Sequence, residues 1–301
     1  RGGESKTKGG NKMSYFNKMR FTMRQVVGLL TIVFLGIAVI AYAASIPSTF
    51  SSGQTISSSA VNQNFQALAD AINTGDVACP SSMVRSGSVC IDKYEASVWE
   101  TTNAGLIAKI KAGTATLAEL QANAVQRGAS ADNYGAGCPD TGNGCKDFYA
   151  ISVAGVTPSR YITWFQAAAA ARNSGKRLPT NQEWQVAAFG TPDSTACNVS
   201  SGAVANTGAN ASCVSDVGAY DMVGNLWEWV ADWVPASTAC PGWGGFSDDL
   251  MCLSGASTTA TSPGALFRGG TWGDGAAAGV FAVAGGYPAG SADSGGFRCV
   301  R

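Results

Sequence analysis

The residues that could do chemistry are nine cysteines and a few carboxylates, because the chain contains no histidine. A Ser-His-Asp or Cys-His site, a histidine-ligated metal and a histidine proton shuttle are therefore excluded. Eight cysteines fall into couples that are close in sequence: 79/90, 138/145, 197/213 and 240/252. No C-x-x-C motif is present, so proximity predicts four disulfides formed in an oxidising compartment rather than a zinc site. Cys299 has no such neighbour.

Two carboxylates, Asp221 and Glu228, flank a glycine-containing turn with exposed carbonyls. Hard oxygen ligands at this close spacing suit Ca²⁺. An alternative interpretation is purely structural. In it, Asp221 and Asn225 hydrogen-bond to the backbone of the loop and Glu228 pairs with an arginine.

Two further groups have a functional and a structural interpretation. The pair Lys176–Arg177 could bind an anion, but ion pairs with Glu183 or Asp92 are the simpler interpretation. Three tryptophans could form a platform for a sugar, and we favour a place in the core for them: Trp227, Trp229 and Trp233.

Composition narrows the class of protein. The chain has 20 basic and 20 acidic residues, and only 13% of its residues are charged, about half the usual share of roughly 25%. A hydrophobic content of 46% is enough for a core, and 38 glycines predict many loops. Positive charge is not clustered outside the N-terminus, which argues against binding to nucleic acid.

Residues 1–43 have the pattern of a signal segment for export. Seven basic residues and one acid precede an apolar run from Val26 to Ile40, and Ala41-Tyr42-Ala43 follows. Basic, apolar, then A-x-A is typical of a secretory signal peptide. The alternative is an uncleaved membrane anchor, so any membrane contact is expected through this segment alone. The pattern predicts export to the periplasm, the cell surface or the medium.

Residues 44–77 are interpreted as a stalk or oligomerisation segment. Val61, Phe65, Leu68 and Ile72 recur at helical spacing and predict an amphipathic helix over about 60–74. A lone helix of this length is marginal in water, so its apolar stripe must pack on something. The stripe could pack against copies of the same helix, which would give a homo-oligomer, or against the chain's own domain.

Residues 78–301 look like one α+β, loop-rich domain. Thr180 opens a helix, because Glu183 completes the capping-box spacing, and that helix ends by Gly190. Residues 128–148 are expected to form a loop that holds one cysteine couple. The other predicted elements are a strand at Val89–Glu95 and helices at Thr116–Arg127 and Ile162–Ser174. Beyond Gly190 the pattern predicts turns, short strands and loops.

Four segments in this order resemble the formylglycine-generating-enzyme, or sulfatase-modifying, family: 90-CIDKYEAS-97, 175-GKRLPTNQEW-184, 221-DMVGNLWEW-229, and 268-RGGTW-272 with 296-GFRCVR-301. The resemblance covers about 79–301 and implies a variant of the C-type lectin fold. It also implies a structural Ca²⁺ held by the side chains of Asp221 and Glu228 and the carbonyls of Gly224 and Leu226.

The chain departs from the catalytic members of this family. They carry a cysteine pair shortly after the Gly-Gly-Ser-Tyr/Trp motif, where this chain has Asp274 and Gly279. Without these thiolates, neither a copper site nor a sulfur nucleophile can form there, and related iron-dependent enzymes need histidines. Ala171 also stands where the family often has a cysteine, which would explain the unpaired Cys299. The departures predict a protein that is not an enzyme.

A narrower resemblance is carried by 155-GVTPSRYITWFQ-166, 173-NSGKRLPTN-181 and 190-GTPD-193, which are similar to the variable proteins of diversity-generating retroelements. In those systems, adenine-directed errors diversify the 3′ end of the target gene. Randomised AAY codons encode no Lys, Glu, Gln, Met or Trp. None of these five residues occurs from Gly273 to Phe297. A glycine- and alanine-rich loop that arose by chance would look the same.

The resemblance therefore implies a surface or secreted protein that binds an unknown protein or glycan on another surface. The variable segment is expected within about 268–301, framed by Arg268–Trp272 and Gly296–Arg301, while Phe281 and Val283 are expected in a core strand. The predicted ligand-binding residues are Gly273, Asp274, Ala277, Ala284, Gly286, Tyr287, Gly290, Ser291, Ala292, Asp293 and Ser294. Two alternatives remain: an invariant lectin-fold structural or adhesive module, and an oxidoreductase of the formylglycine-generating type.

Overall fold

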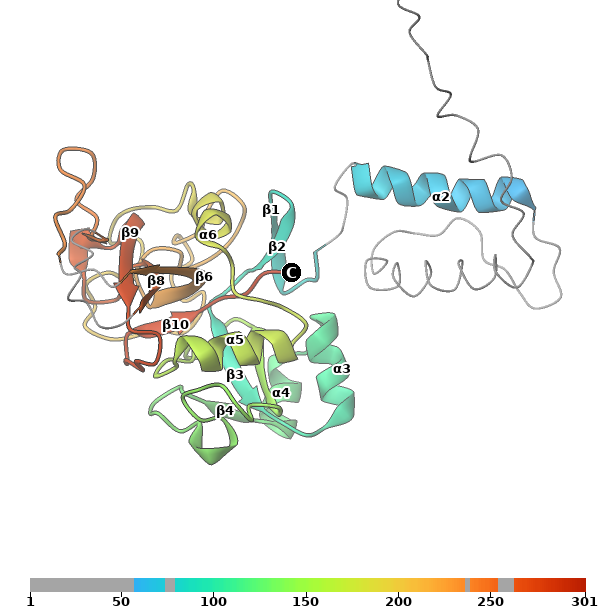
Figure 1. Cartoon of the computed structure of the whole chain (residues 1–301), viewed down its shortest axis with the longest axis horizontal. Helices are drawn as coiled ribbons and strands as arrows, with labels where there is room; N and C mark the ends of the chain where they lie inside the picture. Colours follow the sequence, from blue (N-terminus) through green and yellow to red (C-terminus); the bar gives the residue numbers. More distant parts are fainter. Residues whose placement is uncertain (1–56, 74–78, 236–238, 254–262) are drawn as a thin grey trace, which may run out of the picture. The chain divides into compact units, whose positions relative to one another are not determined.

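The structure is a computed structural model that describes residues 57–73, 79–235, 239–253 and 263–301 (Figure 1). It contains two compact units, residues 1–78 and residues 79–301. The predicted signal segment, 1–43, and the start of the predicted stalk lie outside the described residues. Within the described ranges, no helix is both long enough and apolar enough to cross a membrane.

The described part of the first unit is helix α2 (Ser58–Asn73), which confirms the helix predicted over about 60–74. Ser57 begins it, because its Oγ accepts a hydrogen bond from the Ala60 N–H at 3.1 Å. Phe65 belongs to the predicted apolar stripe and is exposed. Self-association through this helix stays a prediction.

The described residues of the second unit form three sheets and four α-helices, most of which are labelled in Figure 1. The first sheet is the hairpin β1 (Met83–Ser86) and β2 (Val89–Asp92). The second has the antiparallel order β4 (Val125–Arg127), β3 (Ala96–Glu100) and β5 (Phe148–Ser152). The third has the order β10 (Gly295–Phe297), β6 (Trp227–Pro235), β8 (Pro263–Gly269), β9 (Gly279–Gly286) and β7 (Met251–Cys252). The helices are α3 (Ala104–Ala112), α4 (Leu117–Asn123), α5 (Trp164–Asn173) and α6 (Asn181–Ala188).

Two predicted boundaries are wrong. The strand predicted over Val89–Glu95 ends at Asp92, and a bend at 93–95 turns the buried Glu95 side chain toward the interior before β3 begins. The helix predicted over Thr116–Arg127 ends at Asn123, because the chain becomes extended at Ala124 and its last three residues pair with β3 as β4. Helix α3 was not predicted.

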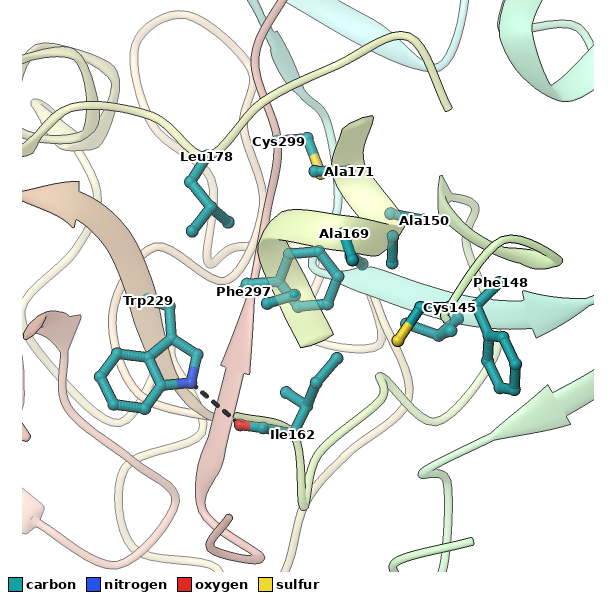
Figure 2. Packing of buried hydrophobic residues seen from close by; sticks show 14 of the residues in the cluster. Cys145, Phe148, Ala150, Ile162, Ala169, Ala171, Leu178, Trp229, Phe297 and Cys299 are labelled. Atoms are coloured by element: carbon teal, nitrogen blue, oxygen red, sulfur yellow. Dashed lines mark hydrogen bonds between the residues drawn. The ribbon is translucent and has the colours of Figure 1, made fainter. Parts of the chain in front are cut away.

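Helices α5 and α6 form where the sequence predicts them. Each begins with a capping box, Thr163 with Gln166 and Thr180 with Glu183. The alanines of α5 are mostly buried, so this helix packs closely into the core. Trp229 of β6 donates from Nε1 to the Ile162 carbonyl at 3.0 Å, which links the five-stranded sheet to the start of α5 (Figure 2).

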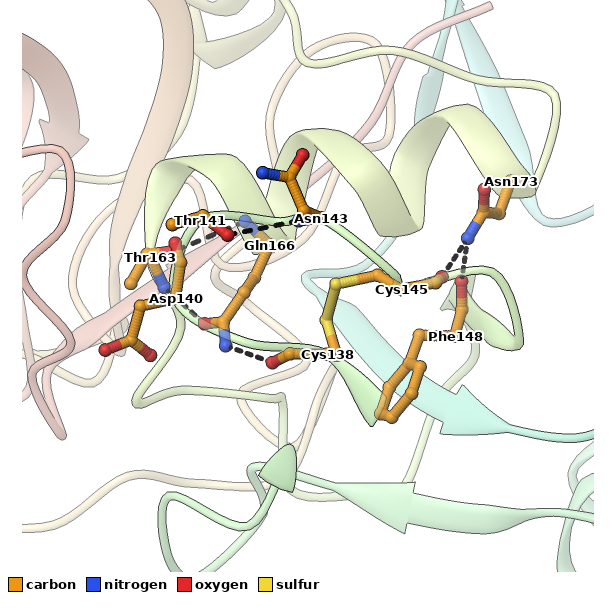
Figure 3. Close-up of a disulfide and its surroundings, with 9 residues drawn as sticks. All are labelled: Cys138, Asp140, Thr141, Asn143, Cys145, Phe148, Thr163, Gln166 and Asn173. Carbon is orange, nitrogen blue, oxygen red and sulfur yellow. Dashed lines mark hydrogen bonds between the residues drawn. A yellow bond between two sulfur atoms is a disulfide. The ribbon is translucent and has the colours of Figure 1, made fainter. Parts of the chain in front are cut away.

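The four predicted disulfides are present: 79–90, 138–145, 197–213 and 240–252. Figure 3 shows how α5 holds the Cys138–Cys145 loop at both ends of the helix. Gln166 in the first turn donates to the Cys138 carbonyl at 2.7 Å, and Asn173 in the last turn donates to the carbonyls of Cys145 and Phe148. Four disulfides are typical of an exported protein.

The second half of the chain has longer strands than the sequence predicts. Strands β6, β8 and β9 have 9, 7 and 8 residues, so they form the body of the largest sheet. Val283 is buried in β9, as predicted, but Phe281 is only half-buried. Its ring packs against the exposed rings of Trp243 and Phe246.

Candidate functional site

The predicted ligand-binding residues all lie at the surface of the C-terminal segment, where each is exposed or half-buried. They do not form one cluster. Three lie in the turn before β9, two lie on β9, and the other six lie in the loop between β9 and β10. Because β9 has eight residues, the turn and the loop are about 25 Å apart along the strand.

The loop Tyr287–Ser294 is positioned by its main chain. Three of its carbonyls accept hydrogen bonds from backbone N–H groups outside the loop: Pro288 from Trp164 at 2.9 Å, Ala292 from Tyr161 at 2.8 Å, and Ser294 from Trp227 at 2.9 Å. Trp164 is the first residue of α5, and its N–H has no acceptor within the helix, so the loop satisfies it. Substituting the loop's side chains leaves these contacts in place. Tyr287 is 61% exposed.

Two polar residues outside the C-terminal segment border this loop. Arg160 donates to the Asp293 carbonyl at 3.4 Å, and Ser291 Oγ donates to Asp132 at 3.4 Å. The Arg160 guanidinium also lies 5.2 Å from the centre of the Tyr161 ring. Sequence reasoning missed Arg160 and Asp132, because nothing local in the sequence indicates that they approach a loop more than 120 residues away.

The turn before β9 contains one residue whose side chain shapes the turn, Asp274, and one position with space for a larger side chain, Gly273. Asp274 accepts a hydrogen bond from the Thr271 N–H at 2.8 Å, so its side chain shapes the turn. At Gly273, an added Cβ would find its nearest neighbour 3.8 Å away. At Gly286, by contrast, a Cβ would lie 2.5 Å from the Phe267 ring. Gly273 therefore has room for a side chain, and Gly286 does not unless Phe267 moves.

A buried ion pair joins the end of the C-terminal segment to β6. Arg298 and Glu228 are both buried, with 2.6 Å between Nη2 and Oε1, and Arg298 Nε donates to both carboxylate oxygens. Arg298 also donates to the main-chain carbonyls of Asp92 and Tyr220, and Trp184 Nε1 donates to Glu228 at 2.7 Å. The conformation of the chain after β10 is thereby fixed.

These contacts decide the calcium prediction at Asp221, Gly224, Leu226 and Glu228. Both oxygens of Glu228 are occupied by Arg298, and Asp221 accepts a hydrogen bond from the Gly208 N–H at 2.7 Å. Asn225 accepts one from the Ala205 N–H at 2.8 Å. Burial raises the pKa of Asp221 to about 6. The set does not fit a calcium ion, because the ion would compete with a guanidinium for Glu228, and the contacts are those of the structural alternative.

The basic pair after α5 has the structural role that we favour. Lys176 pairs with the buried Asp92 at 2.7 Å, and Arg177 pairs with Glu183 at 2.7 Å. Asp92 also accepts a hydrogen bond from the Cys299 N–H at 3.0 Å. These contacts join β2, the segment after α5 and the C-terminus.

The expectation that all three tryptophans are in the core is wrong for Trp233. Trp229 is in the core and Trp227 is half-buried, but Trp233 is 42% exposed. Its ring meets those of Trp164 and Phe165 edge-on, with centroids 5.1 and 5.8 Å apart. Trp233 lies at the end of β6, where the strand leaves the core.

All nine cysteines are among the described residues, and eight of them form the disulfides. The ninth, Cys299, is buried in the same core cluster as Ala171 (Figure 2). Burial raises the pKa of the Cys299 thiol well above its usual value, so it is a poor source of thiolate. At the two positions where catalytic thiols are expected, Asp274 shapes a turn and Gly279 begins β9.

Residues 74–301 match the family model of the sulfatase-modifying factor enzyme 1-like domain. The chain belongs to this family. Its domain has the α+β, C-type lectin-like fold that the sequence motifs imply.

Individual proteins are similar to parts of the chain. A formylglycine-generating enzyme of Thermomonospora curvata is 35% identical over 101 residues, which cover 25% of this chain and 33% of that protein. The structure of a Major Tropism Determinant P3c variant matches with a TM-score of 0.41 and 22% identity, over 74% of this chain and 52% of that one. Treponema denticola variable protein 1 matches with a TM-score of 0.32 and 18% identity, over 48% of this chain and 70% of that one. The chain thus spans about a third of the length of the enzyme.

Proposed function

We propose that this protein is an exported, non-catalytic binding protein whose C-terminal segment presents exchangeable side chains on a fixed backbone. The observation that carries the proposal is the loop Tyr287–Ser294, whose carbonyls are held by main-chain donors while its side chains lie at the surface. Such a loop keeps its shape when its sequence changes. Its ligand would be a protein or a glycan on another surface.

Binding in this proposal depends on preorganisation. Backbone hydrogen bonds hold the loop before the ligand arrives, which lowers the conformational entropy lost on binding. Tyr287 is the largest exposed side chain of the loop and is its expected anchor, because aromatic residues carry much of the binding energy in small interfaces. Ser291 and Asp293 add polar groups to the same loop.

The residue types of the segment support diversification by adenine-directed mutagenesis. The test is deep sequencing of the 3′ end of the gene across the source population. We expect differences to concentrate at the codons of the predicted ligand-binding residues, with Gly273 varying more than Gly286, which has no room for a side chain. If the 3′ end varies no more than the region encoding Cys79–Asp193, the proposal fails and an invariant adhesive module takes its place.

The enzyme alternative makes a different prediction. A formylglycine-generating activity would need two reactive thiols of low pKa, whereas eight cysteines are paired and Cys299 is buried. We expect no thiol of the native protein to react with a small alkylating reagent, and one to react after denaturation without reductant. Two cysteines that react in the native protein would favour the enzyme.

Two further parts of the proposal concern the scaffold. A homo-oligomer through the helix at 60–74 would present several binding loops together, and light scattering of the full chain measures its mass. A structural calcium ion is also part of the proposal, but at a place other than Asp221 and Glu228, whose carboxylates are already engaged.

A further inference from the structure

Three aspartates from two distant segments meet beside the start of the C-terminal segment. Asp193 follows α6, and Asp248 and Asp249 precede β7. One carboxylate oxygen from each lies within 4.8 Å of the other two. Asp193 and Asp248 are exposed, whereas Asp249 is only 1% exposed.

The buried member of this cluster is incompletely satisfied. Asp249 Oδ2 accepts a hydrogen bond from the Phe281 N–H at 2.7 Å, but Oδ1 is buried and has no hydrogen-bond partner. An ionised oxygen removed from water without a partner is strongly unfavourable, so such a group normally coordinates a cation or is protonated. One oxygen of the buried Asp249 carboxylate therefore has no partner, and the carboxylates of Asp193 and Asp248 lie close to this carboxylate.

The charges around the cluster are also unbalanced. Arg268 is the cation that acts on Asp249, but the two do not form an ion pair, and the Arg268 Nε has no partner either. The three carboxylates and this one guanidinium leave a net charge of −2. One divalent cation would balance the group.

The cluster borders a cavity that has room for an ion and its waters. The cavity has a volume of about 200 Å³, and Asp193 and Asp248 line it. Ser194, Thr195 and Ser200, which carry hydroxyl groups, also line it. All these ligands are oxygens, which suit a hard cation, and Ca²⁺ tolerates irregular sets of carboxylates, hydroxyls and waters better than Mg²⁺ does.

We propose that Asp193, Asp248 and Asp249 bind a calcium ion. The ion would join the loop after α6 to the segment closed by the Cys240–Cys252 disulfide. That segment also contacts the C-terminal segment, because the Leu250 N–H donates to the Ala277 carbonyl and the Leu250 carbonyl accepts from the Val283 N–H. Calcium would therefore brace β9, which connects the turn and the loop that contain most of the predicted ligand-binding residues.

The test is calorimetric titration of the full chain with CaCl₂ after chelation and dialysis. We expect one site, with a Kd no weaker than the roughly 10⁻³ M of extracellular calcium modules. At a Kd of about 10⁻³ M, about 5 mM CaCl₂ adds about 1 kcal/mol of stability and should raise Tm by about 2–4 °C, and tighter binding should raise it further. Asp249→Asn should weaken binding at least about tenfold, because it removes the charge of the buried ligand. Asp140→Asn, an exposed aspartate in another loop, is the matched control and should bind as the wild type does.

The variants also separate binding from folding. If Asp249→Asn does not fold, Asp193→Asn and Asp248→Asn replace it, because both residues are exposed. No heat of binding and no change in Tm for the wild type would overturn the proposal, and so would full affinity in the aspartate variants. These outcomes do not depend on whether the C-terminal segment binds a ligand or is diversified.

Discussion

Arg298 Nη2 lies 2.6 Å from Glu228 Oε1, and at least 99% of each side chain is removed from solvent. Glu228 belongs to the sequence motif from which the family resemblance implies a calcium ligand. In the structure, the positive charge that Glu228 needs comes from the arginine of the closing Gly-Phe-Arg-Cys segment. The two most recognisable motifs of the chain thus form one buried contact.

Arg298→Met should destabilise the domain by about 3–5 kcal/mol, because it leaves the Glu228 carboxylate buried without its partner. The measurement is the free energy of unfolding from guanidinium titration. Arg172→Met, an exposed arginine at the end of α5, is the control and should change it by no more than about 0.5 kcal/mol. A loss below about 1 kcal/mol in Arg298→Met would show that the pair is not needed for stability.

Ala171→Cys should form a fifth disulfide with Cys299, because both positions lie in the same core cluster (Figure 2) and Ala171 stands where the family often has a cysteine. The loop it closes has about 128 residues, and the chain-entropy model assigns about 4–5 kcal/mol to such a crosslink. Peptide mapping without reductant detects the bond, and thermal unfolding measures the gain. Two free thiols in the denatured, unreduced variant would contradict the prediction.

Gly273→Tyr and Gly286→Tyr should have different effects on stability, although both replace a glycine of the C-terminal segment. The first adds a side chain where space is open and should change stability by no more than about 0.5 kcal/mol. The second forces Phe267 to move and should cost about 1–3 kcal/mol. Thermal unfolding of the two variants compares them directly. Equal losses would mean that space around the backbone does not decide which positions can vary.

Glu183→Gln should lower stability near pH 7 by about 1 kcal/mol, because Glu183 accepts from Arg177 and caps the start of α6. These contacts lower the pKa of Glu183 to about 2. A carboxyl whose pKa falls on folding contributes stability above its unfolded pKa of about 4.3 and loses it as the pH drops toward 2. The difference between wild type and variant should therefore shrink between pH 4 and pH 2 in unfolding titrations. A constant difference would exclude this charge effect.

The sequence predicts what depends on local pattern. A capping box predicted the start of α6, and close spacing predicted the four disulfide pairs. The strands after residue 227 were underestimated, because β9 consists of glycine, alanine, valine and phenylalanine without a clear two-residue alternation. Contacts between distant segments were missed because no local pattern in the sequence indicates them. Asp193 and Asp249 are 56 positions apart, and only the folded chain brings their carboxylates together.

The main-chain hold on the loop Tyr287–Ser294 has a genetic consequence. The donors are the backbone N–H groups of Tyr161, Trp164 and Trp227, which lie earlier in the sequence. They bind carbonyls of the loop, so these hydrogen bonds do not involve the loop's side chains. If the loop binds the ligand as proposed, the residues that hold its backbone and the residues that contact the ligand are encoded in separate parts of the gene. Mutations confined to the codons of Tyr287–Ser294 would then change the proposed binding surface while the residues that hold the loop stay the same, so one structure would describe the backbone of all such variants.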